Sequence, residues 1–142
     1  MQHHTKTKGD IGVAKVIADL TCNGIDVCIP LSEHLPFDLI GIDEKGILSR
    51  IQVKYISGRD GKIALFFRNH YSDKNGYHTK KHDKTMFDSY AIYCPNTDTI
   101  YYLRTDELVG KESIALRITP SKNNQTKNVK IANEYANANR MF

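Results

Sequence analysis

The stretch Pro36-Phe37-Asp38-Leu39-Ile40-Gly41-Ile42-Asp43-Glu44-Lys45-Gly46 runs directly into Ile47-Leu48-Ser49-Arg50-Ile51-Gln52-Val53-Lys54-Tyr55. Two aliphatic segments therefore flank Glu44-Lys45-Gly46, and Gly46 offers the positive φ that a three-residue hairpin loop needs. With that loop, Asp43 pairs with Ile47, Ile40 faces Arg50, and Asp38 faces Gln52. The sequence predicts a β-hairpin with this register.

The predicted register places Asp38, Gln52 and Lys54 on one side of the sheet, because side chains alternate along a strand. A loop of two or four residues would instead bring Val53 opposite Asp38, so the prediction depends on the loop having three. Carboxylate and amide oxygens are ligands for Mg²⁺, and a lysine stabilises charge on a phosphate. The alternative is a half-exposed strand whose polar face carries these residue types without a catalytic role.

These residues resemble the motif of the PD-(D/E)xK nuclease superfamily and, within it, the group I intron-associated homing endonucleases. Pro36-Phe37-Asp38 matches the proline and metal-binding aspartate, and Gln52-Val53-Lys54 matches (E/Q)xK. Phe37 separates the proline from the aspartate, and Gln52 replaces the usual acid, as it does in the homing branch. The segments "ALRITPSKNNQ" (residues 115–125) and 129–135 are also similar to that family.

The resemblance implies an α/β restriction-endonuclease-like core, with a central mixed, mostly antiparallel sheet, an N-terminal helix and peripheral helices. It also implies site-specific, Mg²⁺-dependent cleavage of double-stranded DNA, with Mn²⁺ as a substitute metal. Asp38 and Gln52 would bind the metal together with the backbone carbonyl of Val53, and Lys54 would orient the attacking water. Relatives are similar in forming oligomers, so a dimer or a tetramer is expected.

A fourth candidate site residue is Asp10, at the start of a helix predicted from Asp10 to Asn23 by apolar residues at helical spacing. Asp10 lies on or beside the apolar face of this helix. In the related endonucleases an acid on the first helix lies near the metal, which makes Asp10 a provisional ligand. Equally, Asp10 is a good helix N-cap.

The remaining pattern predicts one domain over residues 1–142, with frayed ends at about 1–8 and 136–142. Strands are expected at Ile25–Pro30 and, as the third strand of a meander, at Lys62–Phe67. A second hairpin is expected from Asp88–Cys94 and Thr99–Arg104. Thr105 would cap a short helix ending at Gly110, and Ser113–Ile118 would form a last strand.

Two polar segments are candidate DNA contacts. Residues 68–84 are basic and weakly periodic, which suits a loop along a phosphate backbone. Residues 119–128 are rich in amides, which read adenine edges. The predicted contacts are Arg68, His70, Lys74, Lys80, Lys81, Lys84, Lys122, Asn123, Asn124 and Gln125. The alternatives are an ordinary surface loop and an ordinary linker.

Composition is compatible with this reading. The chain has 142 residues, is 40% hydrophobic and carries a net charge of +4, which suits a polyanionic partner. Three cysteines are odd in number and unpaired in spacing, so we expect core residues and no zinc site. Without an apolar membrane-length run or a signal peptide, a cytoplasmic location is expected. Alternative functions are a Holliday-junction-type nuclease and a DNA-binding protein whose catalytic site has decayed.

Overall fold

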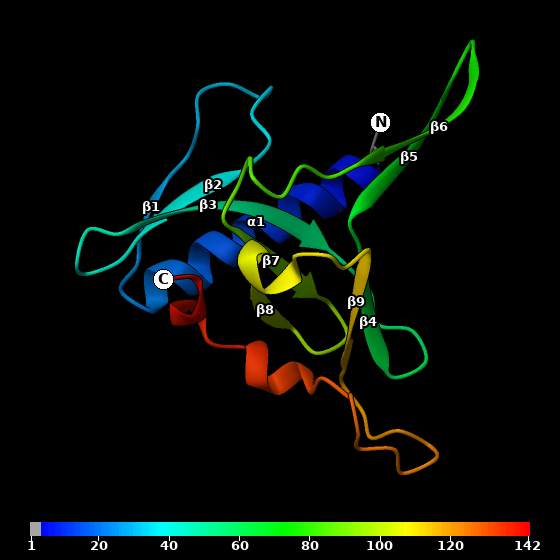
Figure 1. The fold of residues 1–142 in the computed structure, drawn as a ribbon. Helices are drawn as coiled ribbons and strands as arrows, with labels where there is room; N and C mark the ends of the chain where they lie inside the picture. The colour runs from blue at the N-terminus through cyan, green and yellow to red at the C-terminus, as the bar shows by residue number, and fades with distance from the viewer. Residues whose placement is uncertain (1–3) are drawn as a thin grey trace.

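The computed structural model describes residues 4–142. In chain order the elements are α1 (His4–Cys22), β1 (Asp26–Cys28), β2 (Leu39–Ile42), β3 (Leu48–Tyr55), β4 (Lys62–Phe66), β5 (Arg68–Asp73), β6 (Gly76–Lys81), β7 (Ser89–Cys94), β8 (Thr99–Arg104), the 3₁₀ helix η1 (Thr105–Leu108), β9 (Ser113–Arg117), and the 3₁₀ helices η2 (Ala132–Tyr135) and η3 (Ala138–Met141). Figure 1 shows α1 and the strands of the body close together, with β5 and β6 extending away from them. No helix within residues 4–142 is long and apolar enough to cross a membrane.

The predicted hairpin is confirmed in its register. Ile40 pairs with Arg50 and Ile42 with Leu48, and the Asp43 amide donates to the Ile47 carbonyl at 3.0 Å. Gly46 has a φ of 79°, a conformation that glycine adopts without steric cost. The side chain of Asp43 accepts hydrogen bonds from the amides of Lys45 and Ile47, which holds the loop closed.

The described strands form a five-stranded sheet in the order β1-β2-β3-β7-β8. Neighbours are antiparallel except for β3 and β7, which are parallel, so the predicted mixed, mostly antiparallel sheet is confirmed. The predicted meander is wrong, because β4 pairs with β9 in a separate two-stranded sheet. All six residues of β7 are buried, and a strand buried on both faces belongs in the middle of a sheet.

Two apolar clusters cover the two faces of this sheet. Helix α1 packs its buried Val16 and Leu20 against the face that carries Ile51 and Val53. Gly12 is buried in this contact, and a Cβ there would lie 3.4 Å from a methyl carbon of Val53, an ordinary van der Waals distance. The β4–β9 pair and η1 cover the opposite face over β7 and β8. Gln52 and Lys54 alternate with Ile51 and Val53, so they lie on the face opposite α1.

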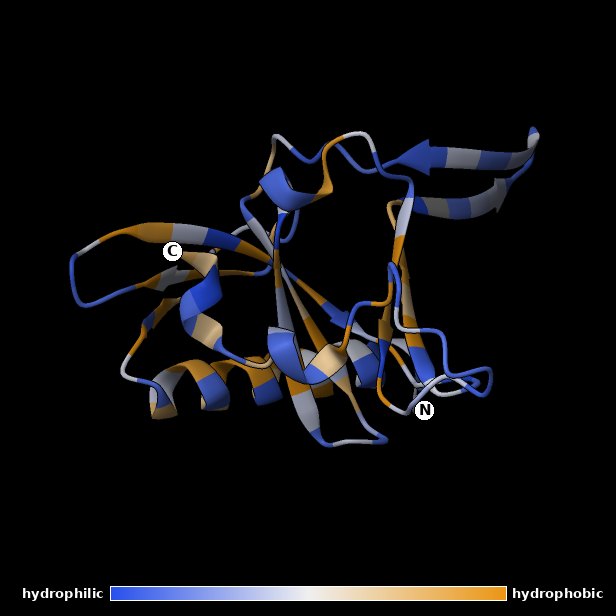
Figure 2. Cartoon of the chain, turned by 60° about the horizontal axis from the view of Figure 1, so that its bottom comes forward, coloured by the Kyte–Doolittle hydropathy of each residue, from blue (hydrophilic) through white to orange (hydrophobic). Residues whose placement is uncertain are grey.

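The segment predicted as a basic loop is instead mostly a β-hairpin. Strands β5 and β6 pair from Arg68↔Lys81 to Asp73↔Gly76 and form what we call the β5–β6 ribbon, residues 68–81. Figure 2 shows that the ribbon is hydrophilic and lies outside the hydrophobic body. The loop prediction was wrong because these two strands have no alternation of apolar and polar residues that would indicate a hairpin. Their cross-strand contacts are instead stacked tyrosine and histidine rings. His70 stacks on Tyr77 at 5.3 Å and Tyr71 on His78 at 5.1 Å.

Several element boundaries also differ from prediction. Helix α1 includes residues 4–9, ahead of the predicted start at Asp10. Thr105 is no N-cap: its buried hydroxyl donates to the carbonyls of Phe87 and Asp88. The tail that we expected to fray contains η3, with Ala138 and Met141 buried. The cysteine expectation holds for Cys94 alone, since Cys22 and Cys28 are exposed.

Asp88 connects β3 to the start of β7, and we expect it to stabilise the fold in a pH-dependent way. Its two oxygens accept hydrogen bonds from the guanidinium of Arg50 at 2.9 Å, and these bonds lower the pKa of Asp88. Stabilisation is then present above the ordinary carboxyl pKa of 3.8 and lost as pH falls through the lowered value. Asp88→Asn is expected to cost about 1 kcal/mol at pH 7, since both side chains are partly exposed.

Urea unfolding at neutral pH and at a pH below the lowered pKa of Asp88 measures this effect. The matched control is Glu112→Gln, which removes a carboxylate 3.9 Å from Lys81 in a highly exposed pair and should change little. A destabilisation by Asp88→Asn that is the same at both pH values would contradict a role for the charge.

Candidate active site

Asp38, Gln52 and Lys54 come together where β2 begins and β3 continues past it. The Asp38 amide donates to the Ile51 carbonyl at 2.8 Å, which extends the hairpin ladder by one residue. Asp38 Oδ2 accepts two hydrogen bonds, from Gln52 Nε2 at 2.8 Å and from the Val53 amide at 2.7 Å. The predicted juxtaposition of Asp38 and Gln52 is therefore present, and their side chains are in contact.

Burial changes the acid–base properties of two groups in this site. Desolvation raises the pKa of Asp38, against the opposing effects of the Val53 amide, the Lys54 charge and the Gln52 amide. Desolvation likewise lowers the pKa of Lys54, against the attraction of Asp38. Both groups are thus shifted toward their neutral forms, a pattern common at catalytic sites and also found in structural ion pairs.

The donor set fits a hard divalent cation. Both hydrogen bonds to Asp38 end on Oδ2, so within residues 4–142 its Oδ1 has no hydrogen-bond donor. The Val53 amide points toward Asp38, and the N–H and C=O of one strand residue point the same way, so the Val53 carbonyl also lies on this side of β3. Mg²⁺ needs few protein oxygens because it keeps several waters.

The described chain has no cluster of three or more His, Cys, Asp or Glu side chains that would hold a metal. Asp38 contacts Gln52 directly, and Asp83 lines the cleft that also contains Gln52 and Lys54. Asp10 is exposed within α1, which packs on the face opposite Gln52 and Lys54. Since α1 already begins by His4, the N-cap alternative for Asp10 is wrong. Its role as a ligand stays a prediction.

Gln52 and Lys54 lie in a cleft of about 550 Å³ whose other side comes from the end of the β5–β6 ribbon and the segment after it. His82 contacts this site: its Nδ1 lies 2.8 Å from the hydroxyl of Tyr90, and Tyr90 is adjacent to Gln52 in the parallel β3–β7 pairing. The sequence did not indicate His82, because nothing in its spacing shows that β7 lies beside β3. The remaining lining residues are His34, Pro36, Lys80, Lys81, Asp83, Met86 and Phe87.

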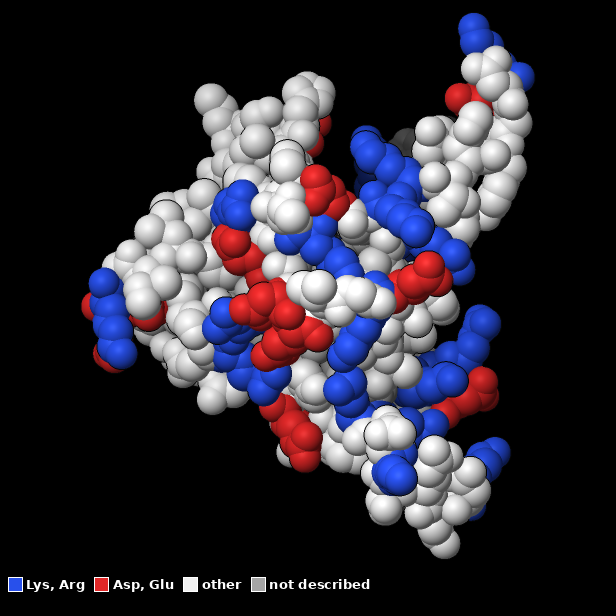
Figure 3. Space-filling view, in the orientation of Figure 1, with Lys and Arg blue, Asp and Glu red and all other residues white. Residues whose placement is uncertain are grey.

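The predicted DNA contacts on residues 68–84 have different surroundings. Lys80 and Lys81 line the cleft, whereas Lys74 lies in the turn at the tip of the ribbon. Figure 3 shows basic side chains at the base of the ribbon and at its tip. Lys84 is engaged within the protein, since its ammonium donates to the carbonyls of Leu108 and Lys111 at 2.5 and 3.1 Å.

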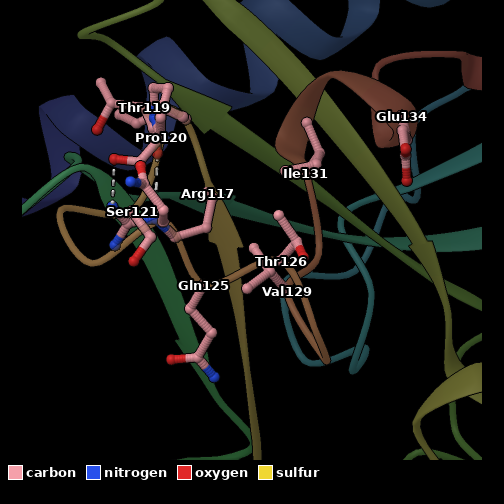
Figure 4. A pocket seen from close by; sticks show the side chains of 11 residues that line it. Arg117, Thr119, Pro120, Ser121, Gln125, Thr126, Val129, Ile131 and Glu134 are labelled. Carbon is pink, nitrogen blue, oxygen red and sulfur yellow. Dashed lines mark hydrogen bonds between the residues drawn. The ribbon is translucent and has the colours of Figure 1, made fainter.

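The second predicted DNA segment is an exposed loop anchored by one arginine. The guanidinium of Arg117 donates to the carbonyls of Thr119 and Pro120, and Figure 4 shows it directed toward them. Arg117 also lines a pocket of about 560 Å³. Residues 122–125 are exposed, and Asn123 accepts a hydrogen bond from the Gln125 amide at 3.3 Å. Lys122, Asn123, Asn124 and Gln125 are thus displayed together, away from the cleft lining.

An acid, an amide and a lysine thus lie together where β2 begins, beside a basic cleft, in the arrangement that the PD-(D/E)xK motif predicts. A family model described as PD-(D/E)XK endonuclease matches residues 3–138. The chain therefore belongs to the PD-(D/E)XK endonuclease family, and the resemblance that the motifs indicated is confirmed.

Among solved structures, the chain is similar to the bacterial homing endonuclease I-Ssp6803I, with 26% sequence identity and a TM-score of 0.72. The match covers 87% of this chain and 83% of that one, so the two share nearly the whole domain. Comparison with curated proteins finds no match.

Proposed function

We propose that this protein is a site-specific endonuclease of the group I intron homing type, which hydrolyses phosphodiester bonds in double-stranded DNA with Mg²⁺. Mn²⁺ would substitute for Mg²⁺. The observation that carries the proposal is the contact of Asp38 with Gln52 and the Val53 amide, next to Lys54 in a cleft edged by lysines. Similarity to a bacterial homing endonuclease supports the narrower assignment.

In this proposal the metal is held by Asp38, by the side-chain oxygen of Gln52 and by the Val53 carbonyl, with Asp10 as a provisional further ligand. Gln52 donates to Asp38 through Nε2, so for its oxygen to join Asp38 on one ion the amide would have to turn over. When bound, Mg²⁺ supplies electrostatic stabilisation of the charge that develops on the phosphate. Because Gln52 is neutral, the site has less negative charge than one with two acids.

Lys54 orients the attacking water and stabilises the phosphate. Burial lowers its pKa, so the amine loses its proton more readily than a surface lysine does. A lysine in this state suits proton exchange with a water molecule at the reacting phosphate. The proposed DNA contacts are the basic residues of the β5–β6 ribbon and the exposed residues 122–125, which would hold the duplex over the cleft. Lys84 keeps its ammonium on two backbone carbonyls of the protein.

A double-strand cut implies at least a dimer, because residues 4–142 form one such site and a duplex has two strands to cut. Symmetric oligomers favour pseudo-palindromic targets. Sedimentation is expected to show a dimer or a tetramer on DNA. A monomer both free and on DNA would contradict this part of the proposal.

The test is incubation of the purified protein with a randomised duplex library in Mg²⁺, followed by sequencing of the new ends. We expect ends clustered at one motif, absent with Asp38→Ala and present with Asp26→Ala, which removes an exposed carboxylate from β1. Bound sequences without new ends would instead indicate a DNA-binding protein with a decayed site. Cleavage of four-way junctions in preference to linear duplex would indicate a structure-selective nuclease.

A further inference from the structure

The β5–β6 ribbon is an exposed hairpin that no hydrophobic core supports. Its strands pair with each other and with no other strand of the described chain. Tyr71 and Tyr77 are 50% and 68% exposed, and each stacks on a histidine of the opposite strand. A two-stranded hairpin is marginal in water by itself. In this hairpin the two ring stacks hold the strands together, while the tyrosines in the stacks stay exposed to solvent. We interpret this exposure as a sign of a surface used for binding.

The base of the ribbon adjoins the cleft. Lys80, Lys81 and His82 line the cleft together with Gln52 and Lys54. Lys80 and His82 lie two residues apart and so share one face, whereas Lys81 belongs to the other face. Side chains alternate along a strand, which places His78 on the face of Lys80, with its cross-strand partner Tyr71. His70 and Tyr77 belong to the opposite face.

The shape and charge of the ribbon match a DNA groove. The major groove is about 12 Å wide and accepts a two-stranded β-ribbon. The ribbon carries four basic residues, Arg68, Lys74, Lys80 and Lys81, against the single carboxylate of Asp73. Asp73 itself is paired with His78 at 2.9 Å, which reduces its repulsion of phosphates. From Lys81 to the tip the strand extends about 17 Å, at about 3.4 Å per residue.

We propose that the β5–β6 ribbon lies in the major groove beside the cut phosphate, with the face of Tyr71, His78 and Lys80 toward the bases. Because 17 Å corresponds to about five base-pair steps, the ribbon determines the sequence preference over about five base pairs on one side of each cut. This inference rests on the proposed function for the location of the cut, and it assigns His70 to the outer face.

The ribbon offers a matched pair of variants. Tyr71→Ala and Tyr77→Ala each remove one tyrosine from one ring stack, on opposite faces of the same hairpin. Library cleavage is expected to show that Tyr71→Ala weakens the preference at these base pairs by about fivefold or more. Tyr77→Ala is expected to change it by less than about twofold. Relaxation by Tyr77→Ala alone would overturn the assignment of the faces, and no change with either variant would overturn the role of the ribbon.

A second measurement needs binding and not cleavage. Dimethyl sulfate methylates guanine N7 in the major groove, so the bound wild-type protein is expected to protect guanines within about five base pairs of the cut. Cleavage without this protection would contradict the ribbon inference and leave the nuclease proposal standing. Protection over one contiguous block of about five base pairs without cleavage, weakened by Tyr71→Ala alone, would support the ribbon and contradict the nuclease. A protein that neither binds nor cuts DNA would overturn both.

Discussion

Replacing Lys54 with alanine is expected to reduce the rate of DNA cleavage by about 10³-fold and to leave DNA affinity within about threefold of the wild type. Lys54 is half-buried beside Asp38, and its ammonium is one charge among the many basic groups that face the duplex. Its loss therefore removes stabilisation of the transition state and little of the binding. Single-turnover cleavage and a binding titration at the same salt concentration measure the two effects separately.

The control variants are chosen to separate charge from packing. Lys54→Met keeps most of the apolar stem and removes the amine, so it should be as inactive as Lys54→Ala but more stable. Lys80 lies at the edge of the cleft, so Lys80→Ala should weaken DNA binding and reduce its dependence on salt concentration. At saturating protein, its cleavage rate should fall less than that of Lys54→Ala. Turnover retained by Lys54→Met would remove Lys54 from the mechanism.

The hairpin and its site residues could be predicted because they depend on local rules. Gly46 determines the loop length, the loop length determines the register, and the register determines that Asp38 meets Gln52. None of these steps needs a residue outside 36–55. The motif match to a nuclease family used the same residues, which is why both arguments led to the same site.

The rest of the cleft could not be predicted, because it depends on which distant strands become neighbours. Residues 62–66 alternate like any half-buried strand, and the sequence does not show that their partner is 113–117. The same holds for β7: its parallel pairing with β3 brings Tyr90, and with it His82, next to Gln52. Parallel pairs have no short connecting loop whose length would reveal them.

Asp10 shows a different limit. Its spacing to Val13 and Ile17 was compatible with a place beside the apolar face of the helix, but spacing does not show which face of the sheet the helix covers. Helix α1 covers the face of Ile51 and Val53, and the catalytic candidates alternate with these residues. Because Asp10 is exposed on this helix, the proposed metal binding would depend chiefly on Asp38.

Asp38→Asn is consequently expected to abolish cleavage, by about 10³-fold or more, while the fold is kept. An asparagine oxygen still accepts the hydrogen bond of the Val53 amide, so the stability should change by less than about 1 kcal/mol. Asp38→Ala leaves that amide and Gln52 Nε2 without their acceptor and should cost about 1–3 kcal/mol in addition to activity.

The effect of Mg²⁺ on the unfolding temperature tests Asp38→Asn without a cleavage assay. A ligand that binds the folded state alone raises the unfolding temperature, so Mg²⁺ is expected to raise that of the wild type. The raised pKa of Asp38 makes this effect weaken as pH falls, because protonation removes the charge that attracts the cation. Asp38→Asn should show no such rise at any pH, whereas Asp26→Ala should match the wild type. An equal rise in Asp38→Asn would place the cation elsewhere, and with it the proposed catalytic centre. Among the described residues, the carboxylate that lines the cleft is that of Asp83. Asp83 accepts two hydrogen bonds from Thr85, which satisfy one of its oxygens, so Asp83→Asn would then be the next variant to measure.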